Sequence, residues 1–117
     1  MEKKILVVED DQTTSQYLKE IFEDNGYKVT IASDGAIAED LVKRIKPDLI
    51  TLDLEMPKEW GPRFYRKMVQ NKELKDTPVI VISGLSDPKH AIKNAVAVIN
   101  KPFNPDKVLK VVKETIG

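Results

Sequence analysis

The sequence contains no cysteine among its 117 residues. This absence excludes a disulfide framework and any metal site built from thiolates. There is also no excess of charge of one sign, because Lys and Arg together number 19 and Asp and Glu also number 19. We therefore expect no direct nucleic-acid binding, which usually needs a basic surface. We expect no membrane association either, since no apolar run is long enough to span a bilayer.

The rest of the composition is typical of one soluble domain. Hydrophobic residues make up 41% of the chain and charged residues 32%, which is too apolar for a disordered segment. A length of 117 residues fits a single domain, and we assign residues 1–117 to it. Residues 1–4 lead directly into an apolar run without the pattern of a signal peptide, so we expect a cytoplasmic protein.

Five short segments have the pattern of β-strands. Four of them are apolar and rich in β-branched residues, as expected for buried parallel strands. They cover residues 5–8, 49–52, 79–82 and 96–99. The fifth segment, 28–32, alternates apolar with polar residues and is predicted to lie at an edge of the sheet.

Between these segments the apolar residues recur with the period of a helix. The first predicted helix ends near Gly26, the second ends before Pro47, and the third begins at the Gly-Pro pair 61–62. A short fourth helix is predicted from the Asp-Pro pair 87–88, and the last follows Asn104 as its N-cap. This alternation predicts a doubly wound α/β domain, (βα)₅, in which helices cover both faces of a parallel five-stranded sheet.

Polar side chains follow the predicted strands at the points where the chain leaves the sheet. They are Glu9, Asp10, Asp11, Asp53, Ser83 and Lys101. Open α/β sheets bind ligands outside the carboxyl ends of their strands, so we expect these side chains to converge although they are distant in sequence.

Several carboxylates at one place repel each other unless a cation neutralises them. With no cysteine and only one histidine in the chain, the available ligands are hard oxygens, which suit Mg²⁺. Lys101 adds a positive charge and Ser83 adds a hydroxyl donor. In this setting Asp53 can act as a carboxylate nucleophile and form an aspartyl phosphate. The chain has neither a GxxxxGK[ST] nor a GxGxxG motif, so a nucleotide is not the expected donor.

Four segments resemble the receiver domain of bacterial two-component response regulators. They are ILVVEDD (5–11), DLEMPKEWG (53–61), VIVIS (79–83) and NKPF (100–103). The resemblance covers nearly the whole chain and implies the flavodoxin-like strand order 2-1-3-4-5. It also implies that a histidine kinase or a phosphotransfer protein donates the phosphoryl group, and that phosphorylation changes the binding of a downstream protein.

The resemblance further implies the roles of single residues. Asp53 matches the phosphorylated position, Ser83 the switch hydroxyl and Lys101 the lysine that precedes a proline. The implied metal ligands are Asp10 and Asp53 directly, Glu9 through water, and Glu55 through its backbone carbonyl. The family pattern also suggests a cis peptide bond before Pro102.

Several positions depart from the family pattern. Val98 stands three positions before Lys101, where receivers usually carry an aromatic switch residue, so we do not expect readout through an aromatic ring. From Ser83 to Lys101 the chain advances 18 positions, roughly four fewer than usual, or about one helical turn. This predicts a shortened fourth helix and a reshaped partner surface. Gly84 follows the hydroxyl and is expected to leave the acceptor open to bulky phosphodonors or to water.

Two other functions fit parts of the pattern. One is a Mg²⁺-dependent phosphatase or phosphotransferase with an aspartyl-phosphate intermediate, although Glu55 stands where such enzymes usually carry a second aspartate. The other is an interaction module without phosphorylation, suggested by Val98 and the short fourth helix and opposed by the acidic cluster and Lys101. Trp60, beside the acceptor, is either a packing residue or a partner contact. The favoured prediction is a signalling switch that catalyses only its own phosphorylation and dephosphorylation.

Overall fold

The computed structural model describes residues 2–84 and 95–117, which form a single five-stranded parallel sheet flanked by helices. The strands are β1 (Lys4–Val8), β2 (Lys28–Ala32), β3 (Leu49–Leu52), β4 (Val79–Ser83) and β5 (Ala97–Asn100). The helices are α1 (Gln12–Glu23), α2 (Gly35–Ile45), the 3-10 helix η1 (Pro57–Glu59), α3 (Trp60–Val69) and α4 (Pro105–Ile116). The strand order β2-β1-β3-β4-β5 confirms the predicted topology. The short helix predicted from 87–88 lies outside the described residues.

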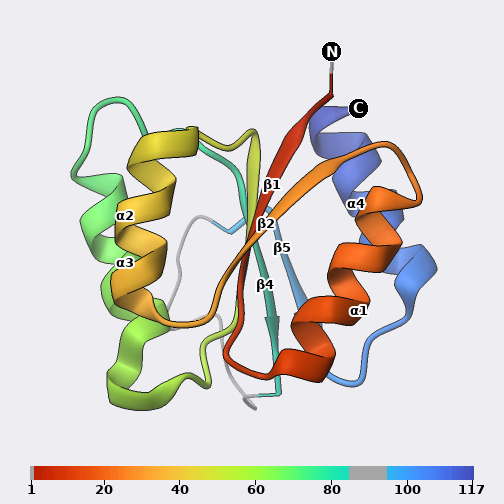
Figure 1. Ribbon diagram of the computed structural model, residues 1–117, viewed down its shortest axis with the longest axis horizontal. Helices are drawn as coiled ribbons and strands as arrows, with labels where there is room; N and C mark the ends of the chain where they lie inside the picture. The colour runs from red at the N-terminus through yellow and green to blue at the C-terminus, as the bar shows by residue number, and fades with distance from the viewer. Residues whose placement is uncertain (1, 85–94) are drawn as a thin grey trace.

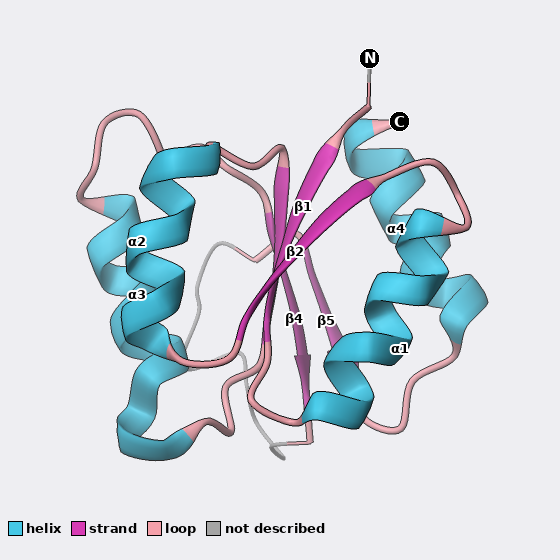
Figure 2. Ribbon diagram, viewed as in Figure 1, coloured by secondary structure: helices cyan, strands magenta, loops and turns pink. Residues whose placement is uncertain are grey.

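Helices cover both faces of the sheet. Figure 1 shows α2 and α3 side by side on one face and α1 and α4 on the other, and Figure 2 shows the strands between them. Alternate residues of one strand enter opposite apolar clusters: Leu6 and Val8 of β1 face α2 and α3, whereas Ile5 and Val7 face α1 and α4. Each fully buried side chain of this size stabilises the fold by about 2 kcal/mol. The strands β1, β3 and β4 are continuous apolar runs because both of their faces are covered.

Side-chain caps set the limits of the helices. Asp11 accepts a hydrogen bond from the Thr14 amide at the start of α1, and Asp34 accepts one from the Ile37 amide at the start of α2. The predicted N-cap Asn104 accepts a hydrogen bond from the Asp106 amide at the start of α4. These contacts satisfy amides that have no partner within their own helix.

Several element boundaries differ from the sequence prediction: β1 begins at Lys4, β4 ends at Ser83 and β5 ends at Asn100, each one residue beyond the predicted limit. Strand β5 begins one residue later than predicted, at Ala97, because pairing with β4 rather than the apolar run sets its limits, and Val96 is 47% exposed. Helix α3 begins at Trp60, directly after η1, instead of at the Gly-Pro pair. Pro62 still lies in the first turn of α3, where a missing amide hydrogen breaks no helical hydrogen bond.

The termini and the carboxyl ends of the strands lie at opposite ends of the molecule. In Figure 1 both chain ends lie near the top, and the arrow of β4 points to the lower end. A parallel sheet places all of its carboxyl ends at that one edge, where the polar residues that follow the strands gather. Within the described ranges, none of the helices combines the length and the apolar character needed to cross a membrane.

Candidate functional site

The carboxyl ends of β1 and β3 bring three acidic side chains together. Glu9 and Asp53 are 2% and 3% exposed, whereas Asp10 is exposed. One carboxylate oxygen of each residue lies within 4.8 Å of those of the other two. Since β1 and β3 are neighbouring strands, the residues that follow them meet although they are far apart in sequence.

Asp11, the fourth acidic residue in this region, has a different position. It lies at the start of α1, where its carboxylate accepts hydrogen bonds from the amide and the hydroxyl of Thr14. These hydrogen bonds lower the pKa of Asp11. The sequence pattern alone does not separate Asp11 from the residues of the cluster, but the structure assigns it to helix capping.

The backbone holds Asp53 from several directions. Its amide donates to the Val8 carbonyl at 3.0 Å, and the Glu55 amide donates to Asp53 Oδ1 at 2.9 Å. Gly61 lies so close behind that a Cβ atom there would be 2.6 Å from the carbonyl oxygen of Asp53. The sequence analysis treated Gly61 only as a helix start and missed this contact. The glycine lets the first turn of α3 approach the backbone of Asp53.

Lys101 lies between the two buried acids. Its Nζ is 2.7 Å from Glu9 Oε1 and 3.5 Å from Asp53 Oδ2. Its backbone amide donates to the Ser83 carbonyl at 3.0 Å, which ties the end of β5 to the end of β4. The peptide bond between Lys101 and Pro102 is cis.

The buried carboxylates and the lysine perturb each other's protonation. Burial raises the pKa of Glu9 to about 7, and the nearby Asp53 adds to this rise, while the hydrogen bond from Lys101 opposes it. Burial disfavours the ammonium of Lys101, but its hydrogen bond to Glu9 and the charges of Glu9 and Asp53 outweigh this and raise its pKa. The site thus gathers negative charge that one lysine only partly balances.

The Glu55 side chain lies beside Gly84. Ser83 ends β4 and is fully buried, and Gly84 follows it. A Cβ atom on Gly84 would lie 2.9 Å from Oε1 of Glu55, so the Glu55 carboxylate fills the volume that a side chain at position 84 would take. The expectation that Gly84 leaves the acceptor open stays a prediction, because Glu55 and Gly84 are both exposed and their proximity does not measure access to Asp53.

Val98 lies within β5, opposite Val81 of β4. It is half-buried and packs against the apolar cluster that faces α2 and α3. Its short aliphatic side chain contributes to packing and provides no ring to swing between two positions. The structure therefore offers no substitute for the aromatic switch at this position.

The donor set fits Mg²⁺. The cluster of Glu9, Asp10 and Asp53 offers three carboxylate oxygens in one small volume, and hard oxygen ligands with room for water suit this ion. A divalent cation would also offset the repulsion between the buried carboxylates. Glu9, Asp10 and Asp53 would hold the ion.

Comparisons with known proteins give one consistent picture. Residues 5–113 match the family described as the response regulator receiver domain. The chain is 35% identical over 117 residues to Protein Rrf1 of Nitratidesulfovibrio vulgaris, covering all of this chain and 85% of that protein. It is 26% identical to the polar-differentiation response regulator DivK of Brucella anthropi, covering all of this chain and 98% of that protein. The structure of the chemotaxis response regulator CheY4 of Vibrio cholerae superposes with a TM-score of 0.90 at 28% identity, over 98% of this chain and 99% of that one.

Proposed function

This chain belongs to the response regulator receiver domain family, and from that premise we propose that it is a phosphorylation-dependent switch whose acceptor is Asp53. The observation that supports this most is the arrangement around Asp53, a buried carboxylate grouped with Glu9 and Asp10 and facing the ammonium of Lys101 at 3.5 Å. Burial of a lone carboxylate would be costly, whereas Asp53 has the Lys101 ammonium beside it and two acids with which to share a metal.

The proposed reaction is a transfer to a carboxylate oxygen. An oxygen of Asp53 attacks the phosphorus atom, a bond from phosphorus to this oxygen forms, and the bond from phosphorus to the donor breaks with its electrons remaining on the donor atom. Lys101 is placed to stabilise negative charge on the phosphoryl oxygens, and the Glu55 amide orients Asp53 through Oδ1. Mg²⁺, when bound to the acidic cluster, neutralises charge on the carboxylates and the phosphoryl group.

The phosphodonor in this proposal is a phosphorylated histidine of a histidine kinase or of a phosphotransfer protein. The consequence of phosphorylation is a changed affinity for a downstream protein. In this proposal the buried Ser83, at the end of β4, responds to the charge of the phosphoryl group. Its carbonyl accepts a hydrogen bond from the Lys101 amide, so the response would extend to the end of β5. Val98 cannot contribute the aromatic movement common in the family, so the readout must use another surface.

Phosphorylation can be tested directly by mass. We expect the purified protein, incubated with Mg²⁺ and acetyl phosphate or phosphoramidate, to gain one phosphoryl group by intact mass spectrometry. Asp53→Asn should abolish this adduct, whereas the matched control Asp40→Asn, on the exposed side of α2, should keep it.

Two results would contradict the proposal. No adduct with either donor, under conditions where the protein is folded, would favour an interaction module without phosphorylation. Repeated release of inorganic phosphate from many phosphate esters, with Asp53 required, would favour a phosphatase or phosphotransferase instead.

A further inference from the structure

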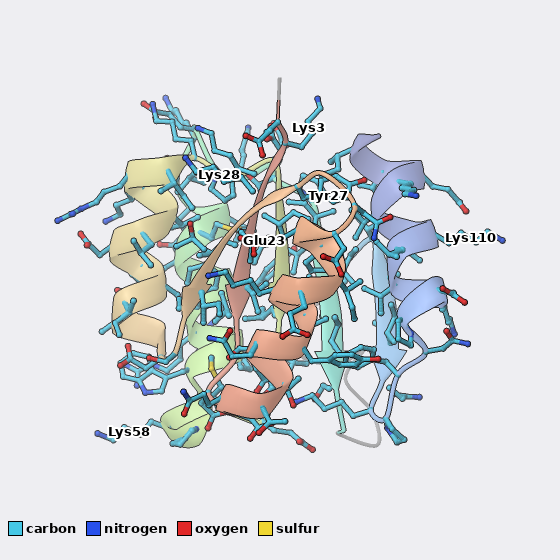
Figure 3. The ribbon with its side chains drawn as sticks, turned by 45° about the vertical axis from the view of Figure 1, so that its right-hand side comes forward. Lys3, Glu23, Tyr27, Lys28, Lys58 and Lys110 are labelled. Atoms are coloured by element: carbon cyan, nitrogen blue, oxygen red, sulfur yellow. The ribbon has the colours of Figure 1, made fainter. Side chains whose placement is uncertain are left out.

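Helix α3 exposes a strongly basic side. Over residues 58–67 the sequence holds four cations and one acid, although the whole chain is balanced at 19 and 19. The cations are Lys58, Arg63, Arg66 and Lys67. Arg63, Arg66 and Lys67 follow the spacing of one helix face, away from the buried Phe64 and Met68. Figure 3 shows Lys58 pointing away from the molecule near the start of this helix. We call these four residues the α3 basic face.

Two arginines of this face lack a carboxylate partner among the described residues. Lys67 pairs with Glu39 of α2 at 3.1 Å. Arg63 lies 5.2 Å from the ring centroid of Trp60, a cation–π contact rather than an ion pair. Apart from Glu59, whose side chain is not among those described, none of the acids in residues 2–84 and 95–117 forms an ion pair with Arg66. Both arginines are exposed at the surface, where an anionic group of another molecule can reach them.

An open pocket of about 280 Å³ is lined by residues of α2 and α3 and meets the basic face at Lys67. Its apolar lining consists of Val42, Phe64, Met68 and Leu74. Lys43 and Lys67 contribute to its charged rim together with Glu39. The apolar floor and the two lysines at the rim, one of which pairs with Glu39, fit a ligand that is apolar on one side and acidic on the other.

We propose that the α3 basic face and the adjoining pocket bind an acidic amphipathic segment of a protein partner. An apolar side chain of the segment fills the pocket while its carboxylates pair with Arg63 and Arg66. Tryptophan and arginine, which Trp60 and Arg63 supply here, are the residues most often found to dominate binding at protein interfaces. A nucleic acid is disfavoured because Glu39 stands at the rim, the floor is apolar and the chain has no net charge.

This face is also joined to the acceptor. The first turn of α3 contacts the backbone of Asp53 through Gly61, and Trp60 of the same turn packs against Gly35 at the start of α2. The added charge and volume of a phosphoryl group on Asp53 can therefore reach both helices that border the pocket. This coupling to phosphorylation rests on the proposed function, whereas binding of the acidic segment does not depend on it.

The test uses a defined probe and the unphosphorylated protein. The probe is a synthetic helical peptide of about 16 residues with Leu or Phe at every third or fourth position and Glu elsewhere. Trp60, the single tryptophan, reports binding by fluorescence, and calorimetry provides a second measurement that does not depend on Trp60. We expect saturable binding that weakens about tenfold or more in the double variant R63E/R66E and weakens as salt is raised.

A matched double variant separates a local effect from a change of net charge. K107E/K110E introduces the same charge change on α4, and Figure 3 shows Lys110 on the side of the molecule away from Lys58. This variant should bind the peptide within about twofold of the original protein. Asp53→Asn should also bind it unchanged, so a failure of the phosphorylation proposal would not be mistaken for a failure of this one.

Four results would overturn the proposal. They are no binding at millimolar peptide, equal loss of binding in both double variants, self-association of the protein through this face in sedimentation experiments, and tight RNA or DNA binding that R63E/R66E abolishes. The last two would assign the face to a second copy of the chain or to a nucleic acid.

Discussion

The Nζ atom of Lys101 lies 2.7 Å from Oε1 of Glu9, although 92 positions separate the two residues. The same ammonium lies farther, 3.5 Å, from Asp53. Lys101 therefore pairs more closely with Glu9 than with Asp53, the proposed acceptor. A metal bound by the acidic cluster would compete with Lys101 for the Glu9 carboxylate. The stability of the protein should therefore depend on both pH and Mg²⁺.

The stability of the metal-free protein should depend on pH through Glu9. Burial raises the pKa of Glu9 from 4.5 to about 7, so the folded state binds this proton more tightly than the unfolded state. The stabilising contribution is fully present below pH 4.5 and is lost as the pH rises through about 7. We expect Glu9→Gln to remove a fall on the order of 2 kcal/mol between about pH 5 and pH 8. Urea unfolding with a chelator, at several pH values, measures this difference, and parallel pH curves for the two proteins would contradict it.

Mg²⁺ should stabilise the folded protein through the acidic cluster. Millimolar Mg²⁺ at about ten times its dissociation constant would add about 1.4 kcal/mol to the free energy of unfolding. Asp10→Asn removes one of the three clustered carboxylates and should abolish most of this gain. Glu20→Gln, on exposed α1 surface outside the cluster, is the matched control and should leave the gain intact. Thermal unfolding with and without Mg²⁺ decides between these outcomes.

Replacing Thr51 with valine should not destabilise the folded protein. Thr51 is 2% exposed in β3, two residues before Asp53, and its hydroxyl has no hydrogen-bond partner among the described residues. Replacing an unpaired buried hydroxyl by a methyl group of similar shape should leave stability unchanged or raise it by about 1 kcal/mol. Thr51→Ser keeps the hydroxyl and removes a methyl group, so it should destabilise by about 1 kcal/mol. A Thr51→Val variant that loses 1 kcal/mol or more in urea unfolding would show that the hydroxyl has a partner in solution.

Alanine at the two glycines near the acceptor should have different effects. At Gly61 a Cβ atom would meet the backbone of Asp53 at 2.6 Å, and neither atom can move without displacing β3 or α3. Gly61→Ala should therefore destabilise by about 1 to 3 kcal/mol and slow phosphorylation. At Gly84 the nearest atom is the end of the flexible Glu55 side chain, so Gly84→Ala should change stability by less than about 0.5 kcal/mol. Comparable losses at both positions in urea unfolding would contradict this contrast.

Much of the fold could be predicted because its signals are local. The apolar runs at β1, β3 and β4 are short and rich in β-branched residues, which is typical of strands covered on both faces. Asn104 before a proline marked the start of α4, and it is the N-cap in the structure. Boundaries were less predictable where pairing decided them, as at Ala97, whose place in β5 follows from its partner Ile80.

By itself, therefore, the sequence determined the order of strands and helices, the parallel sheet and the gathering of Glu9, Asp10, Asp53, Ser83 and Lys101 at one edge. These follow from the period of apolar residues and from the polar residues that end each strand. Only the tertiary structure decided that Asp11 caps a helix, that Glu55 fills the space beside Gly84 and that Lys101 pairs more closely with Glu9 than with Asp53. The reason is physical: secondary structure depends on neighbours along the chain, whereas these contacts depend on how side chains from distant segments share one small volume.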